Sequence, residues 1–92
     1  MIIAKVVGTV ISTRKSCNLV GSKFLIVEPV EEMKLKNENR IVAVDTVGAG
    51  VGEIVLVALG SAARVGCNMA ESPVDAAVVG IVDNRKDIVI TE

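Results

Sequence analysis

The residues that most resemble a chemical motif are the glycines of residues 45–60, which read DTVGAGVGEIVLVALG. Gly48, Gly50 and Gly52 alternate there between two apolar runs. Glycine-rich loops bind phosphate when they join a strand to the N-terminus of a helix, as in G-x-G-x-x-G. Here the third glycine would fall at Glu53, the next run is β-branched without a helical period, and no Gly-Lys-Ser/Thr follows. The stretch therefore favours a tight turn or bulge that uses positive φ over a nucleotide site.

Side chains for acid–base or metal chemistry are few. The sequence contains no His, which removes the usual general base near neutral pH, the Ser-His and Cys-His pairs and the commonest metal ligand. Asp45, Glu53, Asp75 and Asp83 are carboxylates that could pair, but nothing in their spacing sets one apart, and an isolated Asp at a strand end typically serves a turn. We expect no enzymatic activity, no metal and no cofactor.

The two cysteines give no further chemistry. Cys17 and Cys67 lie far apart and form no Cys-x-x-Cys unit, so neither a zinc site nor a redox pair is indicated. In a reducing cytosol we expect two free thiols packed as small hydrophobic residues.

Charge and hydropathy exclude two classes of partner. Ten basic and eleven acidic residues give a formal charge of −1, and Phe24 is the one aromatic residue; a nucleic-acid surface needs a cationic face and usually stacking aromatics. The longest strongly aliphatic run is Ile54–Leu59, far short of the roughly 20 residues of a membrane span. The N-terminus, MIIAKVVGTVIS, lacks the basic region and cleavage pattern of a secretory signal. We expect a cytosolic protein that binds neither nucleic acid nor membrane.

The chain is small for its apolar content. Its 92 residues predict one domain, residues 1–92, while 51% of them are apolar and the mean hydropathy is +0.59. A monomer of this size buries only about 60–65% of the surface of its unfolded chain. Soluble domains rarely expose large apolar patches, so we expect the surplus to be covered by a ligand or by other subunits.

Five short strands are predicted to position the glycine loop. The β-branched runs predict strands at Ile2–Ser12, Lys23–Val27, Ile41–Val44, Glu53–Leu59 and Ala77–Val82, with a possible short closing strand at Asp87–Thr91. Strands this short bury one face by closing on one another. The predicted fold class is all-β, a small closed five-stranded OB-like barrel with one or two single-turn helices.

The remaining segments are predicted as loops and single turns. Residues 13–22 are expected to be a connecting loop. The charged segment Glu31–Arg40 could form a poor single-turn helix, but we favour a solvated hairpin excursion because its apolar residues are only two. Helical turns are predicted at 60–64 (GSAAR) and 72–75 (SPVD), where a Ser stands at the capping position.

Several blocks of sequence resemble a known family over nearly the whole chain. They are Thr13-x-Lys15-x-x-x-Leu19-x-Gly21, FLIVEP at 24–29, AVDTVGAGVGEIVLV at 43–57, GSAAR at 60–64 and PVDAAVVGIVD at 73–83. The chain resembles the vertex proteins of bacterial microcompartments, pentamer-forming shell proteins of carboxysomes and of ethanolamine- and propanediol-type organelles. It departs from the family pattern at Glu28, where Gln is common, at Ala62, where Ser is common, and in the variable excursion 31–40.

The resemblance implies a structural role. Five copies would form a homopentamer that caps the vertices of a polyhedral shell, within the cytoplasm, made otherwise of hexameric shell proteins. It also implies that the central loop lies in subunit contacts near the five-fold axis, with the following turn contributing. The implied interface residues are Asp45, Thr46, Val47, Gly48, Ala49, Gly50, Val51, Gly52, Glu53, Gly60, Ser61 and Arg64. We read the glycines as letting loops converge on the axis, and Asp45 and Glu53 as acceptors of hydrogen bonds from the backbone or from Arg64 of a neighbour. The alternative from the fold alone is an OB-like module that binds a small molecule or nucleotide.

Overall fold

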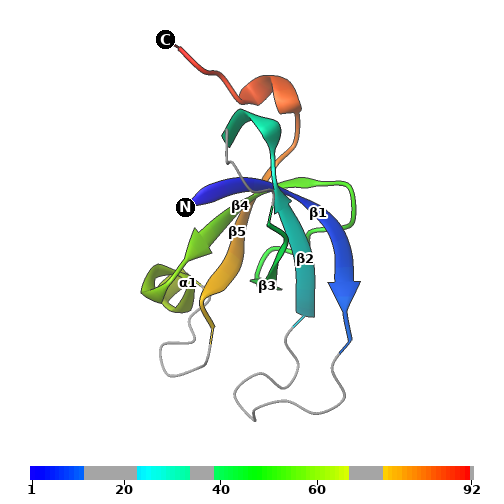
Figure 1. The fold of residues 1–92 in the computed structure, drawn as a ribbon, viewed down its shortest axis with the longest axis vertical. Coiled ribbons are helices and arrows are strands. Elements are labelled where there is room, and N and C mark those ends of the chain that lie inside the picture. The colour runs from blue at the N-terminus through cyan, green and yellow to red at the C-terminus, as the bar shows by residue number, and fades with distance from the viewer. Residues whose placement is uncertain (12–22, 34–38, 67–73, 92) are drawn as a thin grey trace.

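The computed structural model describes residues 1–11, 23–33, 39–66 and 74–91 (Figure 1). Its strands form one closed barrel in the order β1-β2-β3-β5-β4. Their bounds are β1 Ile2–Val10, β2 Lys23–Pro29, β3 Ile41–Asp45, β4 Ile54–Leu59 and β5 Ala76–Val82. The pairings are antiparallel except between β3 and β5, which run parallel. The expectation of a small closed five-stranded OB-like barrel is confirmed.

The period-two pattern of the strands builds the core. Apart from Leu25, the side chains that point inward are small or β-branched, as suits a narrow barrel. Leu25 and Val27 of β2 are fully buried, while Ile26 between them faces outward and is half-buried. The main core cluster consists of Ala4, Val6, Leu25, Val27, Ala43, Ala49, Val55, Val57, Ala76 and Val78. One of these, Ala49, comes from a loop and not from a strand.

A second cluster closes one end of the barrel beneath the short helix α1 (Ser61–Gly66). It contains Val44, Ala58, Ala63, Val74 and Ala77, with Phe24 and Val79 packed against it. The helix lies close to the sheet because residue 66 is Gly: a Cβ there would stand 3.0 Å from Val79 Cγ1. The helical turn predicted at 60–64 is confirmed and extends two residues further.

Strand ends were predicted within one or two residues, but two segments differ from the expectation. Glu31–Met33 forms the 3-10 helix η2 where we favoured a hairpin excursion. The turn forms because Val30 is buried: its amide donates to Ile3 O at 3.1 Å, and its carbonyl accepts from Met33 N at 3.0 Å. Residues 34–38 lie outside the described part, as do Cys17, Cys67 and the first half of the turn predicted at 72–75.

The closing strand predicted at Asp87–Thr91 was wrong. Arg85–Asp87 forms the 3-10 helix η3 instead, with Asn84 as N-cap accepting from Lys86 N, and residues 88–91 carry no strand. The barrel is already closed by five strands, so no free edge remains for a sixth to join. None of the helices in the described residues is long and apolar enough to cross a membrane.

The β3–β4 loop as a candidate assembly surface

The β3–β4 loop, residues 45–53, is organised by the carboxylate of Asp45. Oδ1 of this residue accepts hydrogen bonds from three successive amides, Val47 N at 3.1 Å, Gly48 N at 3.2 Å and Ala49 N at 3.3 Å. The Asp45 side chain is only 2% exposed. Its charge-assisted bonds to backbone N–H groups therefore hold the first half of the loop in one shape.

Lys23 holds the same loop from the neighbouring strand. Its Nζ lies 3.7 Å from Asp45 Oδ2 and donates to Ala49 O at 2.9 Å. The pair arises from strand register, since Lys23 and Asp45 are cross-strand partners at the ends of β2 and β3. Sequence reasoning missed Lys23, although an acid and a base at facing strand ends could have indicated it.

Further bonds tie the loop to the two other strands that it crosses. Thr46 donates twice to Val78 O of β5, from its amide at 3.2 Å and its hydroxyl at 2.6 Å. Gly52 N donates to Val6 O of β1 at 2.8 Å, and Val6 N donates to Glu53 O at 2.9 Å. In Figure 1 the loop is the green segment at the right of the barrel. These bonds make the loop part of the barrel wall.

The three glycines of the loop have two different roles. Gly48 and Gly52 have φ angles of 78° and 93°, a region that side chains with a Cβ avoid. Gly50 does not have a positive φ; its amide donates to Glu53 Oε1 at 2.6 Å, and a Cβ at Gly50 would stand 3.3 Å from the same oxygen. The loop's own amides thus use the carboxylates of Asp45 and Glu53 that we expected to accept from a neighbour.

Apolar side chains of the loop point alternately into the barrel and away from it. Ala49 is fully buried in the barrel core, whereas Val47 and Val51 are 40% and 63% exposed. A braced backbone that presents two valines to the outside is suited to contact with another protein surface, because little conformational entropy remains to be lost on binding.

The second group of predicted site residues lies elsewhere. Gly60 has a φ of 64° and donates to Asp75 O at 2.7 Å, and Ser61 is exposed at the start of α1. Arg64 belongs to α1, but its side chain lies outside the described part of the structure. Figure 1 shows α1 and the β3–β4 loop on opposite sides of the barrel. One chain therefore does not bring the two predicted groups together.

The described residues offer no metal centre: they contain no group of three His, Cys, Asp or Glu side chains that could hold an ion. Fold and loop together define a small OB-like β-barrel that presents a rigid apolar loop to its surroundings. Comparison with known proteins specifies the family. Residues 1–83 match the family described as "Ethanolamine utilisation protein EutN/carboxysome", and the chain belongs to this family.

Named relatives cover nearly the whole chain. It is 51% identical to the bacterial microcompartment shell vertex protein GrpN of Rhodospirillum rubrum over 88 residues, 96% of this chain and 99% of the relative. It is also 51% identical to the carboxysome shell vertex protein CcmL of Synechocystis over 83 residues, 90% of this chain and 83% of the relative. The solved structure of the pentameric GrpN shell protein superposes with a TM-score of 0.77 at 50% identity, covering 91% and 94% of the two chains. The resemblance inferred from the sequence is confirmed.

Proposed function

We propose that this protein is a structural component of a bacterial microcompartment, located in its shell within the cytoplasm, where five copies form a ring that caps each vertex. Two observations support this proposal. Relatives that are 51% identical to this chain are named as shell vertex proteins, and the solved structure of the pentameric GrpN shell protein has the same fold. These findings favour assembly over the alternative of an OB-like module for a small ligand. The role is mechanical, and the chain catalyses no reaction.

The mechanism is geometrical. Hexameric shell proteins tile a flat sheet, and a closed polyhedral shell needs five-fold units at its corners. A cyclic contact between unlike faces of identical subunits supplies such a unit when it closes after five copies. Each subunit must therefore be a rigid wedge, which a closed barrel with a loop bonded to several strands provides.

Within the ring, residues 45–53 form the contacts nearest the five-fold axis. The observation that carries this assignment is the braced loop with Val47 and Val51 exposed. Each chain has the least space near the symmetry axis, so a loop of small residues fits there better than a loop with long side chains. The segment with Gly60, Ser61 and Arg64 contributes to the contact from the other side of the barrel.

Native mass spectrometry of the purified protein at low micromolar concentration tests the assembly. A ring of five 9.6 kDa chains should appear at about 48 kDa. A monomer would contradict the vertex proposal. Ligand binding would then be the leading alternative, and saturable thermal stabilisation by candidate ligands would test it.

The shell role needs a second assay. Co-expression with a hexameric shell protein should give closed particles in electron micrographs, whereas the hexamer alone should give sheets or open tubes. If closed particles form equally well without this chain, the vertex role is wrong, but the pentamer itself is not contradicted.

A further inference from the structure

A ring of identical chains needs two different complementary faces on each chain. We propose that these are the outer surface of β1, β2 and β3, here called the strand face (Gly8, Ile26, Val42), and a groove beside the C-terminal segment, here called the groove face (Ile3, Leu56, Val89). The occupant of each is the other face of a second copy of this chain. This inference rests on the proposed ring and assigns the residues that close it.

The strand face is an apolar row across three strands. Strand register places Gly8 opposite Ile26 and Ile26 opposite Val42, so the three lie side by side on the outside. Val42 is 49% exposed. Ile26 lies over Gly8, where a Cβ would meet its Cδ1 at 3.4 Å. The absence of a side chain at Gly8 leaves room for Ile26, which packs over β1 in the middle of the row.

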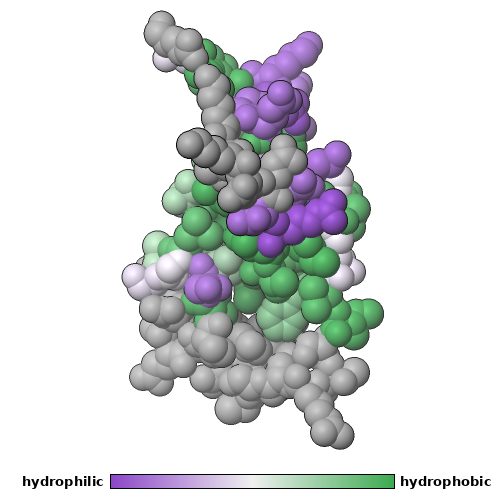
Figure 2. Space-filling model, viewed as in Figure 1, coloured by the Kyte–Doolittle hydropathy of each residue, from purple (hydrophilic) through white to green (hydrophobic). Residues whose placement is uncertain are grey.

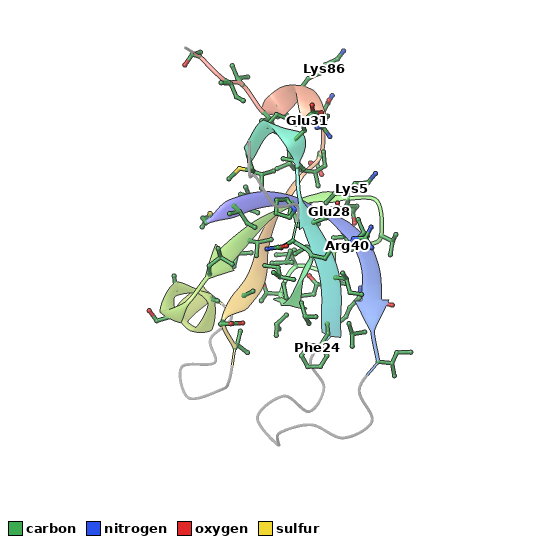
Figure 3. The ribbon with its side chains drawn as sticks, viewed as in Figure 1. Lys5, Phe24, Glu28, Glu31, Arg40 and Lys86 are labelled. Carbon is green, nitrogen blue, oxygen red and sulfur yellow. The ribbon has the colours of Figure 1, made fainter. Side chains whose placement is uncertain are left out.

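Charged residues border the strand face at one end. Lys5 and Glu28 are cross-strand partners of β1 and β2, and Arg40 Nε lies 3.5 Å from Glu28 Oε2. Figure 3 shows the three side chains near one another above the position of Phe24. In Figure 2, a hydrophilic area lies above a hydrophobic one on the same side of the molecule. This border carries two cations and one anion.

The groove face is concave. A groove of about 520 Å³ runs between the barrel and the C-terminal segment. Its floor includes Ile3 and Leu56, which are cross-strand partners of β1 and β4, and its wall includes Val89, which is 75% exposed. Asp83 and Asp87 also line it.

The two faces match in shape and in charge. The apolar row of the strand face, with Val42 as its most exposed side chain, can enter the apolar groove. The cationic border at Lys5 and Arg40 would then approach Asp83 and Asp87 of the next copy, which favours one orientation of docking. The groove face does not match itself, because two grooves set against each other leave a void between them. A contact between unlike faces is therefore preferred over a two-fold contact.

The strand order agrees with a ring built this way. β1 contributes to both faces, with Gly8 in the row and Ile3 in the groove, while β2 and β3 complete the row on one side of it and β4 carries Leu56 of the groove on the other. The β3–β4 loop is hydrogen-bonded to β1 at Val6 and to β2 through Lys23. In a closed ring the axis lies on the side of the subunit between its two contact faces. The loop thus points toward the axis, as its proposed role requires.

Two single-site variants test the faces, Val42→Asp for the strand face and Leu56→Asp for the groove face. Each variant alone should be a monomer, because every contact in its ring would include one damaged face. Mixed in equal amounts, they should form a heterodimer of about 19 kDa, twice the 9.6 kDa chain, and no ring. The reason is that one intact strand face meets one intact groove face while the second contact sets Asp against Asp.

Control measurements separate folding from assembly. Lys86→Asp adds more negative charge at an exposed position whose side chain points away from the barrel (Figure 3), and should leave the ring intact. Far-UV circular dichroism reports whether each variant folds. If Leu56→Asp does not fold, Arg40→Glu and Val89→Asp repeat the experiment at side chains that are 65% and 75% exposed.

The outcomes distinguish this contact from the proposed function. A wild-type monomer overturns both. A wild-type pentamer that survives Val42→Asp or Leu56→Asp overturns the contact alone. Homodimers of either variant, with nothing new on mixing, would show a two-fold contact and also overturn it. Monomers that form the heterodimer only on mixing support it.

Discussion

At the scale of single residues, Asp45 contributes most to the shape of the candidate site. It is a buried carboxylate with three backbone donors and a lysine 3.7 Å away. Removing this acceptor takes a charge-assisted bond from each of three successive amides, of which that of Ala49 is part-buried and those of Val47 and Gly48 are exposed to water. The first half of the loop therefore depends strongly on this side chain.

Asp45→Ala is expected to lower the free energy of unfolding by about 2–3 kcal/mol, because the loop amides lose their acceptor. Asp45→Asn keeps a carbonyl acceptor but loses the charge, and should cost about 1 kcal/mol. Urea denaturation below the concentration at which the chain assembles measures both. Asp75→Ala is the matched control, since Asp75 is exposed. Equal effects at positions 45 and 75 would show that the carboxylate does not hold the loop.

The glycines give a second prediction at this scale. Gly52→Ala places a Cβ at a φ of 93° and should destabilise the chain by about 1 kcal/mol. Gly50→Ala, at a position without positive φ, should cost the monomer less. A Cβ at Gly52 meets nothing within 4 Å in the isolated chain. If Gly52→Ala weakens the pentamer by more than it destabilises the monomer, a neighbouring subunit packs against this position. Native mass spectrometry of a dilution series measures how strongly the pentamer holds together.

At the scale of elements, one ion pair joins the two 3-10 helices. Arg85 of η3 pairs with Glu32 of η2, and their side chains are 52% and 23% exposed. Figure 1 shows both helices at the same end of the molecule, beyond the barrel. The pair attaches the C-terminal segment, and with it the wall of the groove, to the β2–β3 connection.

Glu32→Gln should detach the C-terminal segment while leaving the barrel intact. A partly exposed ion pair contributes about 1 kcal/mol or less to global stability, so the urea midpoint should change little. Trypsin should cleave after Arg85 or Lys86 faster, because local opening exposes the backbone there. Unchanged cleavage would mean that the capped turn of η3 holds the segment without the pair. Glu31→Gln, at an exposed neighbour, is the control.

The elements also show what the sequence could predict. Runs such as FLIVEP and IVLVAL predicted strands because inward and outward positions alternate or are apolar on both faces. A helical turn in Glu31–Arg40 was only the less favoured alternative, because η2 depends on the bond from Val30 to Ile3 O, outside its own segment. The helix η3, which Asn84 caps, was not predicted. The pairing of Lys23 with Asp45 depends on which residues of β2 and β3 face each other, so an acid and a base at two strand ends indicate the pair only once that register is assumed.

At the scale of the whole molecule, the structure shows where the excess apolar residues of the sequence lie on the surface. Exposed apolar side chains occur on the loop at Val47 and Val51, on the strand face at Val42 and beside the groove at Val89. They lie on three separate parts of the described chain, the β3–β4 loop, β3 and the C-terminal segment. Such a distribution suits a chain with a neighbour on each side and an axis at the loop.

This distribution predicts that folding and assembly are linked. Burying three apolar areas in the ring stabilises the native state by mass action, so the melting temperature should rise with protein concentration. For a chain of this size, a ring contact worth a few kcal/mol per subunit should shift Tm by roughly 10 °C between dilute and concentrated samples. Val42→Asp should remove the concentration dependence while retaining the Tm of the dilute wild-type chain. Differential scanning calorimetry over a wide concentration range tests this. A wild-type Tm independent of concentration, in samples that native mass spectrometry shows passing from monomer to pentamer, would mean that the ring buries too little apolar surface to account for the surplus.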